Sequence, residues 1–171
     1  LSLLLWLLTR NIKSLGILPI FFMAMTLVGV YQALTNGIPI SSPQVQNDGA
    51  NVRELLRSPA AKRAFWVQMQ INALSQHGIR SKDMPADWFT MPGKEEMQSA
   101  LVSSLAVFRE NRLVDAGEYA EALELATELV KETDAEEIIM PGIYRGLLVC
   151  DGISLKLLTA RGSADAEEGL R

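Results

Sequence analysis

Twenty consecutive residues without a charged side chain, residues 15–34 (LGILPIFFMAMTLVGVYQAL), constrain the fold of this chain more than any other feature. A helix of about 20 apolar residues is long enough to cross a hydrocarbon core about 30 Å thick. The segment therefore predicts a transmembrane helix. It is not typical of a signal peptide, because another apolar stretch precedes it and no small-residue cleavage site follows. Pro19 falls near its start, where a missing N–H is tolerated.

The chain begins inside an apolar run (LSLLLWLLTR) and not with Met. We expect residues 1–8 to be the end of an earlier span, and the chain to be the C-terminal part of a longer, multi-pass membrane protein whose membrane portion here is residues 1–40. Basic residues lie on both sides of the full span, which leaves its orientation open by the positive-inside rule. They are Arg10 and Lys13 before the span and Arg53, Arg57, Lys62 and Arg63 after it. We expect the helical tail that follows the span to be cytoplasmic.

From residue 52 onward, apolar residues recur at helical spacing, and no segment alternates with the period of two that is typical of a strand. We therefore expect an all-α fold, with transmembrane helices followed by a small soluble helical domain. A loop rich in Gly, Pro and Asp (HGIRSKDMPADWFTMPGK) divides the soluble part. It separates a helical segment and loop, residues 52–90, from a helical tail, residues 94–171.

The helical tail contains one pattern that is typical of a tetratricopeptide-like helical hairpin. Gly117 provides a turn, Tyr119 follows it, and Ala122 and Ala126 are small residues at positions where two helices would cross closely. A single unit of this kind predicts a small helix-pair domain and not a repeat array. A partner-binding role for the tail is one interpretation; helices that pack for stability alone are the other.

The composition excludes several kinds of site. A net charge of −4 with no basic patch argues against nucleic-acid binding. The only histidine, His77, and the only cysteine, Cys150, cannot complete a zinc site of three or four protein ligands. The apolar neighbours of Cys150 (GLLVC) predict a buried, inert thiol. Trp66 and Trp88 are predicted to be packing anchors, since each has apolar neighbours in sequence.

The segment after the span, residues 35–56 (TNGIPISSPQVQNDGANVRELL), allows two interpretations. In the first it is only a turn, because Asp-Gly favours turns, and Asp48 or Asn51 caps a helix that begins near Val52. In the second, Asp48 binds a metal ion. A carboxylate at membrane depth is costly unless it is paired or coordinated, so an intramembrane acid marks a functional site.

Asn36-Gly37-Ile38-Pro39 at the end of the span, followed by Asp48-Gly49, resembles the third-ligand region of the intramembrane zinc metalloproteases of the site-2 protease family. That family carries an Asn-x-x-Pro and a downstream Asp-Gly at a late transmembrane helix. One branch continues, as this chain does, into a helix, a loop ending in Trp and a tetratricopeptide-like tail, so the resemblance extends from residue 15 to about residue 165. The gap between Pro39 and Asp48 is longer than in better-known members, and HExxH is absent from this chain.

The resemblance implies that residues 41–51 form a metal-ligand loop in which Asp48 is the third zinc ligand. Asn36 and Pro39 would shape a broken helix, and Gly49 would permit a tight backbone. The two histidine ligands and the general base of HExxH are expected upstream of Leu1, so this chain itself would hold no catalytic residue and would bind zinc only with those upstream ligands. The substrates would be membrane proteins or peptides. The alternative is a non-enzymatic, membrane-anchored helical scaffold that binds protein partners.

Overall fold

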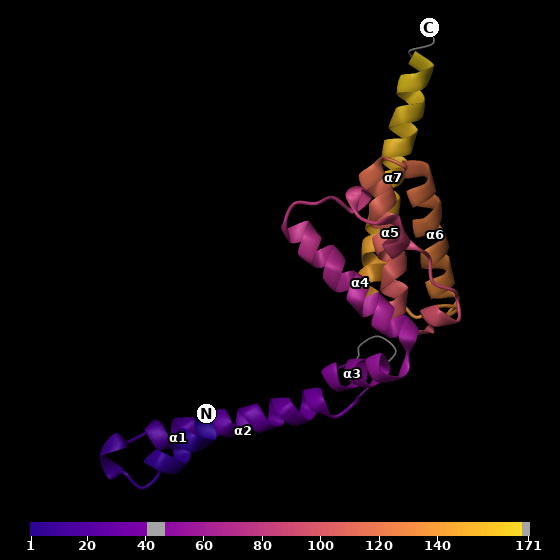
Figure 1. The fold of residues 1–171 in the computed structure, drawn as a ribbon. Helices are drawn as coiled ribbons and strands as arrows, with labels where there is room; N and C mark the ends of the chain where they lie inside the picture. The colour runs from indigo at the N-terminus through magenta and orange to yellow at the C-terminus, as the bar shows by residue number, and fades with distance from the viewer. Residues whose placement is uncertain (41–46, 169–171) are drawn as a thin grey trace. The chain divides into compact units, whose positions relative to one another are not determined.

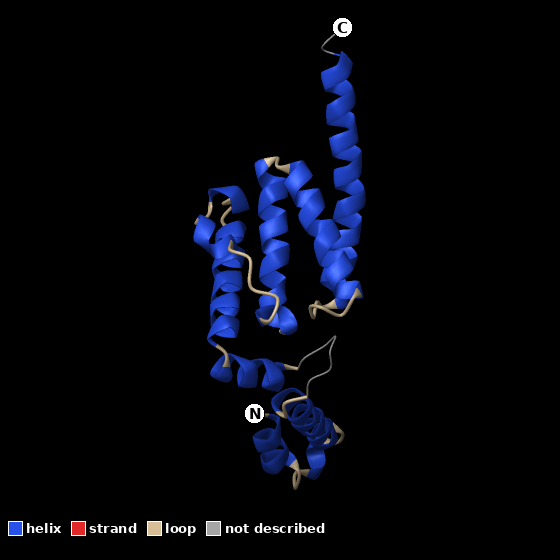
Figure 2. Ribbon diagram, turned by 90° about the vertical axis from the view of Figure 1, so that its right-hand side faces the viewer, coloured by secondary structure: helices blue, strands red, loops and turns tan. Residues whose placement is uncertain are grey.

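All regular secondary structure is helical in residues 1–40 and 47–168, which are the residues that the computed structural model describes (Figure 1). The predicted all-α class is confirmed there, because these residues contain no strand (Figure 2). The α-helices are α1 (Ser2–Thr9), α2 (Leu18–Gly37), α3 (Asp48–Arg57), α4 (Pro59–Gln76), α5 (Ala100–Ala116), α6 (Tyr119–Asp134) and α7 (Gly142–Glu168). Short 3₁₀ turns are η1 (Lys13–Leu15), η2 (Ser81–Asp83), η3 (Ala86–Phe89) and η4 (Glu96–Gln98).

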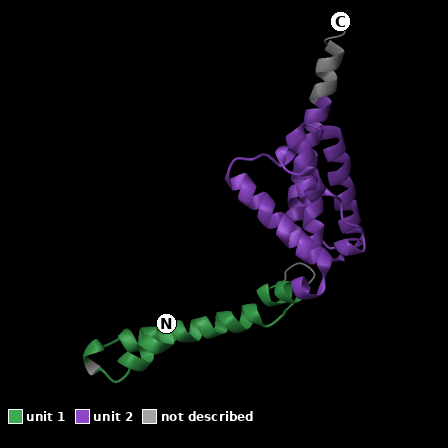
Figure 3. Cartoon of the chain, viewed as in Figure 1, with its two compact units in different colours: residues 1–42, 46–53 green, residues 43–45, 54–171 purple. Residues whose placement is uncertain are grey.

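The chain forms two compact units, one of residues 1–42 and 46–53 and the other of residues 43–45 and 54–171 (Figure 3). The first unit contains α1, α2 and the start of α3. The second contains the end of α3 and all later helices. Of the predicted metal-ligand loop, residues 41–46 lie outside the described part of the chain.

In the first unit, α1 lies along α2, and the Thr26 hydroxyl donates a hydrogen bond to the Ser2 hydroxyl at 3.2 Å. Pro19 occupies the first turn of α2, as predicted, where no intrahelical N–H bond is lost. Among the described residues, α2 is the one helix that is long and apolar enough to cross a membrane. Its 20 residues include no buried side chain, so its apolar surface faces outward in this chain.

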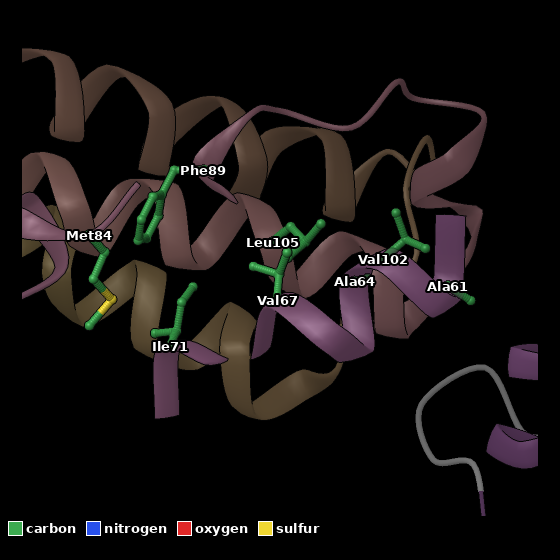
Figure 4. Close-up of a cluster of buried hydrophobic side chains, with 8 residues drawn as sticks. All are labelled: Ala61, Ala64, Val67, Ile71, Met84, Phe89, Val102 and Leu105. Atoms are coloured by element: carbon green, nitrogen blue, oxygen red, sulfur yellow. The ribbon is translucent and has the colours of Figure 1, made fainter. Parts of the chain in front are cut away.

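The second unit is built around α5. Helix α4 begins at Ser58, whose hydroxyl accepts a hydrogen bond from the Ala61 N–H at 3.1 Å, with Pro59 as the first helical residue. One face of α4 packs against α5 and against the 3₁₀ segments that follow α4 (Figure 4). The buried side chains in this cluster are Ala61, Ala64, Val67, Ile71, Met84, Phe89, Val102 and Leu105.

Helices α5 and α6 form a hairpin that turns at Gly117, which has φ +84°, a left-handed conformation that glycine adopts at little cost. Ala122 and Ala126 of α6 are fully buried, and their predicted place in a tetratricopeptide-like helix crossing stays a prediction. The last helix, α7, packs mainly on α6. Residues 142–168 form this single continuous helix.

Three expectations about individual residues were wrong. Helix α3 begins at Asp48 and not near Val52. Cys150 is exposed, although a buried thiol was expected. Its apolar neighbours in sequence do not indicate burial, because the outward face of α7 is as apolar as its packed face. Trp66 is 50% exposed and touches Trp88 edge to face, with ring centroids 5.4 Å apart, so of these two only Trp88 packs partly into the core.

Candidate functional site at the end of the apolar helix

The site predicted from the sequence begins where α2 ends. Gly37 is the last helical residue, and Ile38 has φ −72° and ψ 122°, an extended conformation. A proline disfavours helical backbone in the residue before it, so Pro39 accounts for the extended Ile38 and for the end of the helix. Asn36 lies exposed in the last turn of α2. Asn36 and Pro39 are thus both at the helix end, although their part in a broken helix stays a prediction.

Asn47 joins the end of α2 to the start of α3. Its side-chain NH₂ donates to the carbonyl oxygens of Thr35 at 2.6 Å and Ile38 at 2.5 Å, groups that a helix end leaves without intrahelical partners. Its side-chain oxygen accepts from the N–H groups of Ile40 and Ala50, both at 3.0 Å. The Ala50 bond makes Asn47 the N-cap of α3. One amide therefore caps both helices.

Gly49 makes the closest approach between the two helix ends. A Cβ atom on Gly49 would lie 2.8 Å from the backbone carbonyl carbon of Gly37 and 3.0 Å from the carbonyl oxygen of Asn36, and it would also meet the Gly37 oxygen. These neighbours are backbone atoms, which cannot swing away as a side chain could. Only glycine fits this position without displacing a helix end. The tight backbone expected at Gly49 has this packing as its physical basis.

Asp48 is the first residue of α3 and is exposed. The predicted capping role of Asp48 or Asn51 is wrong, because Asn47 supplies the cap. Within the described part of the chain, no group hydrogen-bonds to the Asp48 carboxylate. A negative charge in the first helical turn is stabilised by the helix dipole. Asp48 therefore presents a charged oxygen ligand between two residues whose positions are fixed by hydrogen bonding and by close packing.

A complete zinc site needs three or four protein ligands. Across residues 1–40 and 47–168, no group of three or more His, Cys, Asp and Glu side chains is close enough together to hold a metal ion. The chemistry of Asp48 fits one carboxylate position of such a site. The other ligands of a complete zinc site are not found among the described residues.

Two informative residues were missed by the sequence interpretation. Asn47 precedes Asp48 in a run of three polar residues, and any of Asn47, Asp48 and Asn51 has the chemistry of an N-cap. The other is Glu110 of α5, which falls in a charged stretch (FRENR) that is typical of a solvated helix face. A register count along α5 could have found Glu110, since Ala106 and Leu113 lie on the same helical face and both are buried.

Glu110 has 0% exposure, and neither of its carboxyl oxygens has a hydrogen-bond partner among the described residues. Burial, with a smaller contribution from the nearby Asp151 carboxylate of α7, raises the pKa of Glu110 to about 7. Its neighbours along α5 belong to the apolar clusters that α5 forms with α6 and α7. Glu110 is therefore a carboxyl group that destabilises the second unit when it is ionised.

In comparisons with protein-family models, curated proteins and solved structures, nothing matches this chain.

Two substitutions of Asn47 separate its two capping roles. In Asn47→Ala the first turn of α3 and the end of α2 should both lose protection, at a cost of roughly 2 kcal/mol, because a lost N-cap and lost hydrogen bonds each cost about 1 kcal/mol. In Asn47→Asp the cap of α3 should survive, because the carboxylate can still accept from Ala50 N–H. The end of α2 should still be released, because Asp cannot donate to Thr35 and Ile38.

Amide hydrogen exchange of Ala50 and of Ile38, whose N–H closes the last turn of α2 by bonding to the Leu34 carbonyl, checks both expectations when it is measured on the full chain in detergent micelles. Equal protection of Ala50 in the Ala and Asp variants would contradict the assignment of Asn47 as the cap of α3.

Proposed function

We propose that this chain is the C-terminal part of a multi-pass, membrane-embedded zinc metalloprotease that hydrolyses peptide bonds of membrane proteins. Asp48 is its third metal ligand, and the two histidine ligands and the general base belong to an HExxH helix outside this sequence. The observation that carries the proposal is the position of Asp48. It is an exposed carboxylate that has no hydrogen-bond partner among residues 1–40 and 47–168, and it lies between Asn47 and Gly49 at the end of an apolar helix long enough to cross a membrane.

The local geometry suits the role of a ligand. Asn47 satisfies the carbonyl groups that the break after α2 exposes, which lowers the cost of irregular backbone near a membrane. Gly49 lets the start of α3 approach the end of α2. Together they place the carboxylate of Asp48 at this junction, and no group in the described part of the chain donates a hydrogen bond that it would have to give up before it binds a metal.

A zinc ion with two His and one Asp ligand keeps a position for water, lowers the pKa of that water and polarises a peptide carbonyl. Asp48 contributes charge and ligand geometry to such a site and is not the base. In the same proposal the helical tail is cytoplasmic, and its α5–α6 hairpin, which resembles a tetratricopeptide-like unit at Gly117, Ala122 and Ala126, recognises a partner or controls access of the substrate.

A non-enzymatic, membrane-anchored scaffold is the second candidate. The observation that favours it is the apolar surface of the second unit: Trp66 of α4 and Ile143, Ile153 and Leu157 of α7 are all at least half exposed. Such surfaces mark sites of association. In this alternative the tail binds protein, and Asp48 only contributes charge to the first turn of α3.

The two candidates differ in the effect of Asp48→Asn. In the full-length protein with its HExxH helix, we expect this change to reduce zinc-dependent cleavage of a membrane-protein substrate at least about 100-fold, since even residues that merely support metal ligands cost 10–100-fold when replaced. Bound zinc, measured per chain after membrane extraction, should fall in parallel. Membrane insertion should not change, because the side chain is exposed and lies outside the apolar helix α2.

The matched control is Asp87→Asn, which neutralises an exposed carboxylate in η3 and should leave cleavage and zinc content unchanged. Persistent cleavage in Asp48→Asn would show that Asp48 is not a ligand. The scaffold candidate predicts that neither variant changes any activity.

A further inference from the structure

Glu110 lies between two apolar clusters that α5 forms with α6 and α7. Ala106, one turn before it on the same helical face, belongs to a cluster with Leu148 of α7. Leu113, about one turn after it, belongs to a cluster with Leu155 of α7. Glu110 itself is completely buried, and neither carboxyl oxygen has a hydrogen-bond partner among the described residues. The three helices therefore enclose a carboxyl group for which they provide no hydrogen bond.

Asp151 of α7 is the charged residue that faces Glu110. It is half-buried, between Leu148 and Leu155 on the packed face of α7. Burial is the larger cause of the raised pKa of Glu110, and the Asp151 carboxylate is the smaller one. Two carboxylates on facing helices repel each other when both are ionised. An ionised Glu110 therefore meets a like charge here and no hydrogen-bond donor among the described residues.

The other elements that pack on α5 turn their charged side chains away from Glu110. Ala122 and Ala126 of α6 are fully buried, and every charged residue of α6 is exposed except Glu132, which pairs with Lys94 at 2.5 Å. The segment η4 contributes Met97 to the apolar cluster. Helix α4, η2 and η3 pack around another face of α5, and their charged side chains are all exposed.

The remaining charged residues of α7 that the structure describes do not compensate Glu110 either. Arg145 is paired with Asp134 of α6, with a nitrogen-oxygen distance of 2.7 Å, and Lys156 is exposed. Ionisation of Glu110 would thus place an uncompensated charge in an apolar contact, which is costly unless water reaches the charge.

We propose that α7 is a proton-controlled cover of the α5–α6 hairpin: it packs on the hairpin while Glu110 is protonated and is released when Glu110 ionises. Helix α6 is joined to α5 by the tight turn at Gly117, whereas α7 is the last helix of the unit and packs mainly on α6. Release of α7 opens Glu110 to water and also removes the charge of Asp151. This behaviour requires neither zinc nor the proposed protease activity.

Release uncovers an apolar face of the hairpin. Ala106 and Leu113 of α5 and Ala122 and Ala126 of α6 belong to the clusters that α7 completes with Leu148 and Leu155. The hairpin is therefore covered in acid and becomes accessible as the pH rises.

The size of the effect follows from the linkage between proton binding and release. The pKa of Glu110 is about 7 while α7 is packed, against an ordinary value of 4.5. Release should therefore become more favourable as the pH rises from 4.5 to 7 and should level off above pH 7. Between pH 5 and pH 8, these two pKa values raise the equilibrium constant for release about 70-fold.

Amide hydrogen exchange of the full chain in detergent micelles tests the proposal, with protection expressed relative to an unfolded peptide at the same pH. The Leu148 and Leu155 amides of α7 should lose about 70-fold in protection between pH 5 and pH 8. At both pH values they should be less protected than the Val67 and Ile71 amides of α4, which open only when the whole unit unfolds. Equal protection of the α7 and α4 amides would show that α7 leaves only on global unfolding, and would overturn the proposal.

Substitutions of Glu110 test whether this residue is the one that titrates. In Glu110→Gln, protection of Leu148 and Leu155 should be the same at pH 5 and pH 8, and Glu110→Met, which buries no polar group, should behave in the same way. Asp151→Asn should keep a smaller pH dependence, because Asp151 is the smaller cause of the raised pKa. Glu128→Gln, on an exposed position of α6, should change nothing. A pH dependence of α7 that persisted in both Glu110 variants would overturn the proposal.

Discussion

Replacing Glu110 with methionine is expected to stabilise the second unit and to remove most of a pH dependence. In the folded chain, burial raises the pKa of Glu110 to about 7 from 4.5. Between pH 4.5 and pH 7 the Glu110 carboxyl group ionises in the unfolded state and stays protonated in the folded state. The free energy of unfolding therefore falls as pH rises through this range. One pKa unit corresponds to 1.36 kcal/mol, so the natural chain should lose about 2–3 kcal/mol of unfolding free energy between pH 5 and pH 8. Below pH 4.5 the group is protonated in both states and this loss disappears.

Glu110→Met keeps the length of the side chain and removes the charge, so its unfolding free energy should exceed that of the natural chain by at least this amount at pH 8 and by less at pH 5. Denaturant unfolding of the full chain in mild detergent, followed by the fluorescence of Trp66 and Trp88 in a Trp6→Phe background, measures the difference.

Glu110→Gln is the matched control for charge. It cannot ionise, so it should share the flat pH profile, but it leaves a buried polar group without partners and should be less stable than Glu110→Met. Glu128→Gln, on an exposed position of α6, should leave the profile unchanged. If the unfolding free energies of the natural chain and of Glu110→Met changed with pH in the same way, ionisation of Glu110 would not destabilise the folded chain, and the expectation would be wrong.

Gly49→Ala is expected to separate the start of α3 from the end of α2. The added methyl group would overlap the backbone of Gly37, and overpacking of this kind costs about 1–3 kcal/mol. The cost should be seen as faster amide hydrogen exchange at Ala50 and Asn51 in the full chain. In the proposed protease, the zinc affinity of the full-length protein should fall as well, because Asp48 is displaced together with residue 49.

Gly29→Ala is the control, because it makes the same substitution at a position with no neighbouring atoms. Nothing lies within 4 Å of a Cβ atom at Gly29, in the middle of α2. Alanine favours a helix interior over glycine by roughly 0.5–1 kcal/mol, so this variant should be as stable as the natural chain or more stable. Equal effects of the two variants would contradict the close approach at Gly49.

Features that depend on local chemistry could be predicted from the sequence. The end of α2 before Pro39, the break before Pro59 and the turn at Gly117 each follow from the backbone limits of one residue type. The apolar span of α2 follows from composition alone. The all-α class follows from the helical spacing of the apolar residues from residue 52 onward.

Features that depend on neighbours distant in sequence could not be predicted. Three polar residues near residue 50 can each cap a helix, and the choice of Asn47 depends on carbonyl groups of α2 that its amide reaches. Glu110 has the chemistry of a surface residue and is buried because α6 and α7 cover that side of α5. Cys150 has apolar neighbours in sequence, yet α7 is apolar on two faces, so its neighbours do not reveal which face is covered.

The hydrogen bonds of Asn47 also limit how this position can change in evolution. A side-chain amide has two donor hydrogens and two acceptor lone pairs, and here all four are used. Asp, Ser and Thr keep an acceptor but lose one or both donors, and Gln carries the same groups one methylene further away. No other side chain of the standard set reproduces the four bonds from this backbone position, whereas the carboxylate of the neighbouring Asp48 makes no such bond to any residue that the structure describes and is open to selection on its charge.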